Sequence, residues 1–126
     1  MLNEKKIEWI LRIGVAGEFL GHGVLAIMGK QDWINWINQL TGIETSMATT
    51  LLLIVGVMDV LLAIIVLVKP IRPILLWMAF WGLFTAFIRP LVNDFSFTSW
   101  LDFIERFANW AAPLALYYLL QKKSER

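Results

Sequence analysis

Four long apolar segments stand out along the chain, at residues 7–28, 47–68, 73–91 and 100–120. Each has close to the roughly 20 residues that an α-helix needs to cross the hydrocarbon core of a bilayer. The segments that join them carry glycine, proline and short polar stretches, which are typical of turns. The pattern therefore predicts one domain over residues 1–126 and an all-α fold, a transmembrane four-helix bundle with antiparallel up-down topology.

A shorter segment at residues 32–40 follows the first apolar segment. It is too short to span a bilayer, but its apolar side chains recur at helical spacing on one face: Trp33, Trp36, Ile37 and Leu40. The pattern predicts a short interfacial helix in the first outer loop, lying on the membrane surface. Two roles stay open for this helix, a lid or anchor for the bundle and a gate for a substrate.

Composition narrows the class of protein. Of the 126 residues, 59% are hydrophobic and 17% are charged, which is too apolar for a soluble domain of this size. Cysteine is absent, so neither a disulfide nor a thiol relay exists within the chain. The formal net charge of +1 gives no sign of nucleic-acid binding, and no nucleic-acid partner is expected. These features predict an integral membrane protein whose first partner is the lipid bilayer.

Lysine and arginine are distributed unevenly between the loops. They gather before the first segment, between the second and third, and after the fourth, whereas only Lys30 and Arg89 lie near the other loops. By the positive-inside rule, we expect both termini in the cytoplasm and a multi-pass protein in a bacterial inner (cytoplasmic) membrane. The first segment contains charged residues, and no cleavage site of small residues follows it. We therefore expect a retained helix and not a signal peptide.

Several charged residues lie within the apolar segments, at different depths. Glu8, Arg89 and Asp102 lie within two residues of a segment end, where a charge is expected to reach the interface. Glu18 and Asp59 lie near the middle of their segments. A carboxylate at the bilayer centre costs about 2.5–3.5 kcal/mol on an insertion scale. Both carboxylates are therefore expected to face the interior of the bundle or each other.

A second polar layer is expected nearer the outer surface. His22, Glu105 and Arg106 share a depth of about 8–9 Å below the outer boundary at 1.5 Å per residue, and Asn109 lies deeper. His22 also follows Glu18 by one helical turn. The candidate ligand or proton network comprises Arg12, Glu18, His22, Asp59, Arg89, Glu105, Arg106 and Asn109. The alternative interpretation is structural, with each polar group satisfying the next and holding the bundle together.

The histidine and tryptophan content limits the cofactors. His22 is the only histidine, and an imidazole can exchange protons or hydrogen-bond a quinone carbonyl. A haem would need a second axial ligand from a partner chain and zinc would need more histidines, so neither haem nor a metal site is expected. Trp77 and Trp81 are the candidates for packing against a quinone. The spacing of Gly17 and Gly21 predicts close approach of a neighbouring helix.

The first two segments resemble a known family. The stretch 11–30 has an arginine, spaced glycines, the pair His22-Gly23 and a final Lys30, and it is similar to the opening signature of the DoxX-like membrane proteins. The second segment, with Asp59 at its centre, resembles the second helix of that family, although a glutamate is more usual there. The resemblance implies a small four-helix integral membrane protein. The positions that match the family pattern are Arg12, His22, Lys30 and Asp59.

Characterised DoxX-like proteins are associated with membrane redox work, including the small-subunit partners of a thiosulfate:quinone oxidoreductase. The resemblance therefore implies a subunit or accessory of a quinone-linked membrane redox complex, with quinone as candidate cofactor. Its partners would be the other subunits of that complex, or a second copy of the chain in a homodimer. The sequence assigns no catalytic residue and leaves enzyme activity open. Two alternatives remain, a non-enzymatic structural or assembly subunit and a small-solute or proton pathway.

Overall fold

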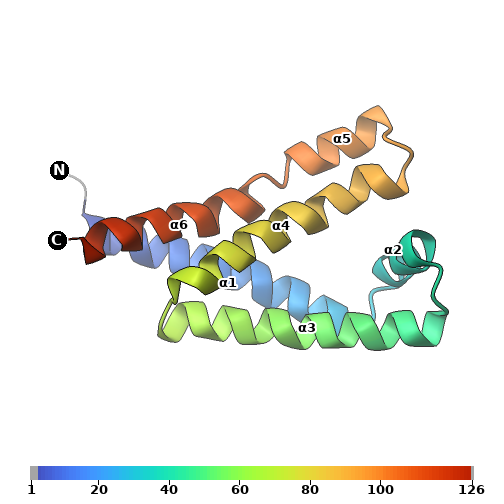
Figure 1. The fold of residues 1–126 in the computed structure, drawn as a ribbon, viewed down its shortest axis with the longest axis horizontal. Helices are drawn as coiled ribbons and strands as arrows, with labels where there is room; N and C mark the ends of the chain where they lie inside the picture. Colours follow the sequence, from blue (N-terminus) through green and yellow to red (C-terminus); the bar gives the residue numbers. More distant parts are fainter. Residues whose placement is uncertain (1–2, 126) are drawn as a thin grey trace.

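A computed structural model describes residues 3–125, and all of its regular structure is helical, which confirms the all-α prediction. Consecutive helices are joined by short turns, and in Figure 1 they form an elongated body with both chain ends together at one end. The helices are α1 (Glu4–Ile27), α2 (Gln31–Thr41), α3 (Thr45–Val68), α4 (Arg72–Val92), α5 (Phe97–Ile104) and α6 (Ala108–Ser124).

Three of these helices, α1, α3 and α4, are long and apolar enough to cross a membrane. They have 24, 24 and 21 residues, which at about 1.5 Å per residue exceeds the roughly 30 Å thickness of a hydrocarbon core. The first three predicted segments are therefore continuous helices of spanning length. By length and composition, the structure supports a membrane protein.

The fourth predicted segment is different. A single helix over 100–120 was expected, but a turn at residues 105–107 divides it into α5, with 8 residues, and α6, with 17. Within the turn, the backbone N–H groups of Arg106 and Phe107 donate to the carbonyl oxygens three residues earlier, the tighter pattern of a 3₁₀ turn. The prediction of a continuous helix was wrong, because apolar composition alone does not indicate a local change in backbone hydrogen bonding.

The closest helix crossing joins α1 to α3 at Gly23 and Gly56. A Cβ atom added to Gly23 would lie 2.8 Å from the Gly56 carbonyl oxygen, and one added to Gly56 would lie 2.7 Å from that of Gly23. Only glycine allows this backbone separation at both positions. The close approach predicted at Gly17 and Gly21 was wrong, because no described neighbour lies within 4 Å of a Cβ at either position.

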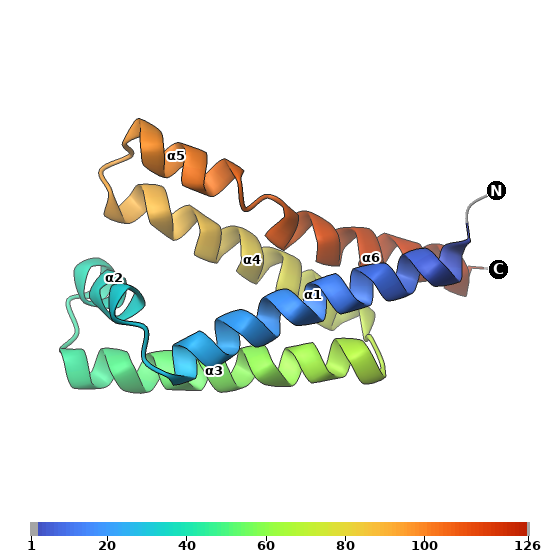
Figure 2. The same ribbon diagram turned by 180° about the vertical axis from the view of Figure 1, so that it is seen from behind.

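A second close crossing joins α4 to α6. A Cβ on Gly82 would lie 2.3 Å from the backbone oxygen of Asn109, so the start of α6 rests directly on α4. These pairs form two arms, α1 with α3 and α4 with α6, and α1 also packs against α6. The arms lie together at the end with the chain termini and separate toward the opposite end, as the two views of Figures 1 and 2 show.

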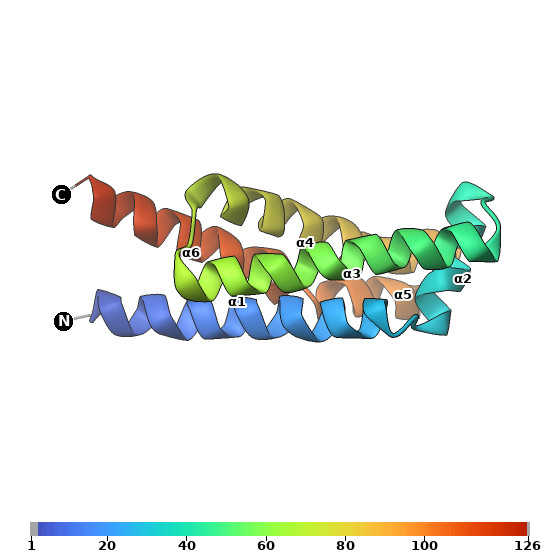
Figure 3. The same cartoon turned by 90° about the horizontal axis from the view of Figure 1, so that it is seen from below.

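The two ends of the molecule have different cores. Near the termini, Val15, Val66, Leu75, Met78 and Leu116 are fully enclosed. At the open end, α2 lies between the arms, on the α3 side, as Figures 1 and 3 show. Its buried anchor is Ile34, which packs in a separate cluster with residues of α1 and α3. The cavity described below lies under this helix.

The predicted short helix is confirmed, with bounds at Gln31–Thr41 in place of 32–40. It ends at Gly42, whose φ of 76° is the left-handed conformation typical of a glycine after a helix. On its far side, Gln39 Nε2 donates to the backbone oxygen of Val92 at 2.9 Å, so α2 bridges from α3 to the end of α4.

Candidate functional site

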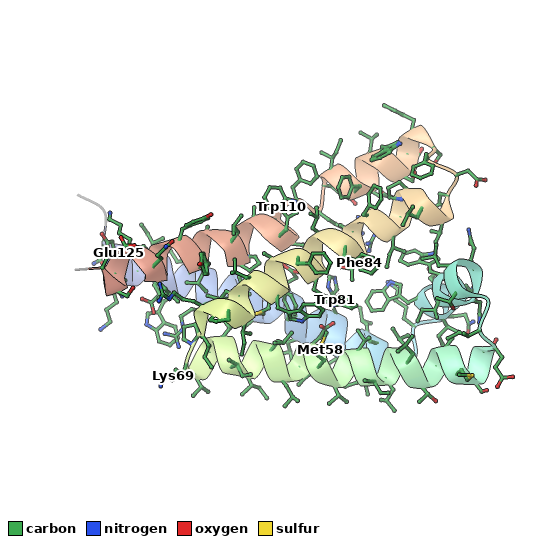
Figure 4. All side chains as sticks on the ribbon, in the orientation of Figure 1. Met58, Lys69, Trp81, Phe84, Trp110 and Glu125 are labelled. Carbon is green, nitrogen blue, oxygen red and sulfur yellow. The ribbon has the colours of Figure 1, made fainter. Side chains whose placement is uncertain are left out.

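A cavity of about 300 Å³ lies at the open end of the molecule, between α1, α2, α3 and α4. This volume is at the lower end of the range for small-molecule sites, about 300–1,000 Å³. The cavity exists because α3 and α4 diverge, and α2 closes its outer end without filling it. Figure 4 shows Trp81, one of its lining residues, between α4 and α3.

Two carboxylates, Glu18 of α1 and Asp59 of α3, lie at the inner end of the cavity. Asp59 is only 5% exposed, and its Oδ1 atom is buried without a hydrogen-bond partner among the described residues. The two acidic groups are close enough to interact electrostatically, and the Trp81 indole lies beside Asp59. The inner end therefore brings two acidic groups together and leaves Oδ1 of Asp59 without a hydrogen-bond partner among the described residues.

His22 lies one helical turn farther out from Glu18, on the same helix. Its ring meets the Trp33 indole edge-on, with 5.7 Å between the ring centroids. None of the side-chain hydrogen bonds within residues 3–125 involves the imidazole nitrogens of His22. They therefore retain their capacity to bind a polar group of a ligand.

Arg89 of α4 marks the outer end of the cavity. Its Nη1 atom donates to the backbone oxygen of Thr85 at 3.1 Å, and its guanidinium lies 5.3 Å from the centroid of the Trp36 ring. Arg89 was expected to be a boundary charge, and it is instead half-buried beneath α2. The cavity thus has two acidic side chains at its inner end and a basic side chain at its outer end.

The walls between these polar ends are apolar. Leu52 and Val55 of α3 face Phe84 and Ile88 of α4 across the cavity. Phe84 and Leu51, which also lines the cavity, are both more than two-fifths exposed. Because α3 and α4 also diverge at this end of the molecule (Figure 1), we infer that the cavity opens between them. Because α3 and α4 are candidate membrane spans, an opening between them faces lipid once the helices lie in a bilayer.

The cavity brings together half of the predicted network. Glu18, His22, Asp59 and Arg89 line it, as does Trp81, one of the two tryptophans proposed to pack against a quinone. The other predicted residues are elsewhere. They are Arg12, Trp77, Glu105, Arg106 and Asn109.

Arg12 lies near the chain termini, in a separate cluster of charges. Its Nε atom donates to the Val66 backbone oxygen at 2.9 Å, a second guanidinium nitrogen donates to the Leu67 oxygen, and Nη1 pairs with Glu8 at 3.1 Å. Glu8 also accepts from Lys123 of α6 at 2.5 Å. The expectation that Glu8 is a solvated boundary charge was therefore wrong, since it is buried and links α1 to α6.

The residues around the turn between α5 and α6 lie outside the cavity. Glu105 and Arg106 pair with each other at 2.7 Å, and Arg106 also donates to the Asp102 backbone oxygen at 2.9 Å. Asn109 contributes its backbone to the crossing with Gly82. Arg106 still acts electrostatically on both His22 and Arg89, so the turn influences the outer end of the cavity without lining it.

Trp77 stacks on Trp81 with 5.5 Å between ring centroids, but it lies on the outer side and does not line the cavity. Conversely, two tryptophans that sequence reasoning left out of the site, Trp33 and Trp36 of α2, do line it. The sequence feature that could have identified Trp33 and Trp36 was the apolar face of the short helix. The sequence alone did not show what that face covers.

No protein-family model matches the chain, and neither a curated protein nor a solved structure matches it. The resemblance to DoxX-like proteins therefore stays a prediction. Within the described part of the chain, no three acidic or histidine side chains are grouped so that they could hold a metal ion. A proposal of function therefore rests on the geometry of the cavity.

Proposed function

We propose that the chain is an integral membrane protein that binds the head group of a lipid-soluble molecule in the cavity beneath α2. The observation that carries this proposal is the cavity itself. It combines two acidic side chains at its inner end, one with an unpartnered oxygen among the described residues, apolar walls, and an opening between two helices of membrane-spanning length. A ligand that is polar at one end and apolar at the other matches this arrangement.

The membrane arrangement that we propose has four crossings, with α5 and α6 together forming the last one. Basic residues lie at the start of α1, at the turn from α3 to α4 and at the end of α6. Figure 3 shows these three parts of the chain at the end of the molecule with the termini. By the positive-inside rule, this end lies in the cytoplasm and α2 lies at the outer surface of a bacterial inner membrane. Interruption of a spanning helix is tolerated where neighbouring protein covers the freed backbone, and α4 covers it here.

A quinone is the specific ligand that the DoxX resemblance implies, and the chain would then be a subunit or accessory of a quinone-linked redox complex. The polar demands of a quinone are modest, namely hydrogen-bond donors for two carbonyl oxygens. His22 supplies an imidazole N–H group within the cavity, and the apolar walls suit the ring. An isoprenoid tail would leave through the opening between α3 and α4.

The test measures the binding of decylubiquinone to the purified protein in lipid nanodiscs. Binding is detected by the quenching of tryptophan fluorescence. Val55→Phe places a ring in the cavity and is expected to weaken binding at least about tenfold, because the ring competes for the same volume. Ile54→Phe, on the adjacent outward position that is 61% exposed, is the matched control and should bind like the wild type.

His22→Ala is expected to weaken quinone binding as well, because it removes a donor within the cavity. If decylubiquinone does not bind the wild-type protein, the quinone form of the proposal is wrong. If no lipid-soluble molecule distinguishes Val55→Phe from Ile54→Phe, the cavity is not a ligand site. The polar groups would then be structural, as expected for an assembly subunit.

A further inference from the structure

The two carboxylates of the cavity have no positively charged partner. Neither Glu18 nor Asp59 takes part in an ion pair within residues 3–125, where the acidic partners are Glu4, Glu8 and Glu105. The charge that acts on Glu18 is that of Asp59, which repels it.

The isolation of these carboxylates is unusual within this molecule. Glu8, the other buried acid, is held by both Arg12 and Lys123. Asp59 is buried more deeply than Glu8, yet its Oδ1 atom has no hydrogen-bond partner within residues 3–125. Burying a charge without a partner is costly, so a buried unpaired acid that lines a cavity points to a partner that enters from outside.

The basic residues of the same region do not serve as that partner. Arg89 is at the opposite end of the cavity, bound to Thr85 and lying over Trp36. The acids that act on its charge are Asp102 and Glu105 of the α5 region, not those of the cavity. Lys30 lies over the Trp33 ring, 4.7 Å from its centroid, outside the cavity lining.

We propose that the cavity binds a lipid-soluble organic cation, a protonated amine or quaternary ammonium carried on an apolar body. The positive group lies between Glu18 and Asp59, and the apolar body lies against Val55, Trp81 and Phe84. This inference rests on the proposed function, because it assumes that the cavity takes a ligand from the bilayer. It names a different head-group chemistry from a quinone, one that the charges of the cavity favour.

Charge complementarity explains why the head group would be positive and not merely polar. In a region of low dielectric, a cation between two carboxylates is attracted by both and relieves their mutual repulsion. A neutral head group offers only hydrogen bonds, and an anionic one is repelled. The aliphatic and aromatic walls bind the apolar body regardless of charge, so charge is what discriminates between ligands of one shape.

The first experiment compares phenylbutylamine, protonated at neutral pH, with phenylbutanol, a neutral ligand of nearly the same shape. Affinities for the wild-type protein are measured by tryptophan fluorescence in nanodiscs of zwitterionic lipid, with empty nanodiscs subtracted. We expect the amine to bind at least about tenfold more tightly than the alcohol. Equal affinities, or a preference for the alcohol, would overturn the inference.

The second experiment uses variants of the two acids. Asp59→Asn and Glu18→Gln keep the side-chain shape and remove the charge, and each should weaken amine binding about tenfold and alcohol binding far less. Glu44→Gln, an exposed acid at the start of α3, is the control and should bind the amine like the wild type. Unchanged amine affinity in both cavity variants would contradict the inference. Should the variants not fold, the wild-type comparison of the two ligands decides it.

The same assay separates failure of the inference from failure of the proposed function. Suppose that decylubiquinone or the alcohol binds the wild-type protein and binds Val55→Phe more weakly, whereas the amine does not bind. The cavity then takes a ligand but not a cation. If the amine binds with the expected preference and decylubiquinone does not, the cation is the better description of the ligand. If none of the three probes binds, both proposals are wrong.

Discussion

The buried guanidinium of Arg12 provides a prediction about stability. It donates to the backbone oxygens of Val66 and Leu67 in the last turn of α3 and to the carboxylate of Glu8, and it lies 3.9 Å from the Trp9 ring centroid. A cation at a helix C-terminus also interacts favourably with the helix dipole. Arg12, which is itself buried, thus fixes α1 to the end of α3.

Replacement by methionine keeps much of the side-chain volume and removes every one of these hydrogen bonds. Breaking a buried ion pair by removing one partner costs about 3–5 kcal/mol, and an unpaired buried carbonyl costs about 1–3 kcal/mol. Glu8 keeps Lys123 as a partner, which reduces the first cost. We therefore expect Arg12→Met to lower the free energy of unfolding by about 2–4 kcal/mol.

The assay is denaturant unfolding in detergent micelles, followed by intrinsic tryptophan fluorescence. Arg72→Met is the matched control, because Arg72 is exposed at the start of α4 and makes no ion pair with the described residues. Its unfolding free energy should change by less than about 0.5 kcal/mol. Equal unfolding midpoints for Arg12→Met and Arg72→Met would refute the structural role given to this cluster.

Three further predictions concern packing and the helix above the cavity. Gly23→Val should lower the free energy of unfolding by about 1–3 kcal/mol, because its Cβ would meet the Gly56 oxygen. Gly17→Val, at a position without such a contact, is the control and should not lower it, and denaturant titration measures both variants. Ile34→Ala should loosen α2 and speed ligand exchange in stopped-flow measurements, with exposed Asn35→Ala as control, and equal exchange rates would contradict a lid role. Glu105→Gln removes an exposed ion pair, so its thermal midpoint should stay within about 1–2 °C of the wild type, and a large fall would contradict the surface position of this pair.

Helix type and length were readily predicted because hydrophobicity repeats over long distances. Three apolar segments of suitable length became continuous helices, and the apolar face of the short segment became α2. The break at 105–107 was not predicted, because a local change in backbone pairing leaves little trace in an apolar segment. Glycine spacing was ambiguous for a similar reason: Gly17 and Gly21 have the expected pattern, but Gly23 is the one that meets another helix.

The candidate site was partly predictable. Depth alone placed Glu18 and Asp59 together in the interior, and the cavity contains both. Depth does not determine which side of a helix meets which neighbour, so Arg12 was grouped with residues from the other end of the molecule. The cavity itself depends on the divergence of α3 and α4, which is a property of helix packing that no single segment encodes.

The most direct test of the central claim is to locate a bound lipid-soluble ligand by photo-cross-linking. Diazirine derivatives of phenylbutylamine and of decylubiquinone would be activated on the protein in nanodiscs, and the modified residues would be identified by mass spectrometry. We expect adducts between residues 51 and 59 of α3 and between 81 and 89 of α4, on side chains that line the cavity, and we expect their loss in Val55→Phe. Adducts spread over outward residues such as Ile54, Leu61 and Phe80, unchanged in that variant, would contradict it.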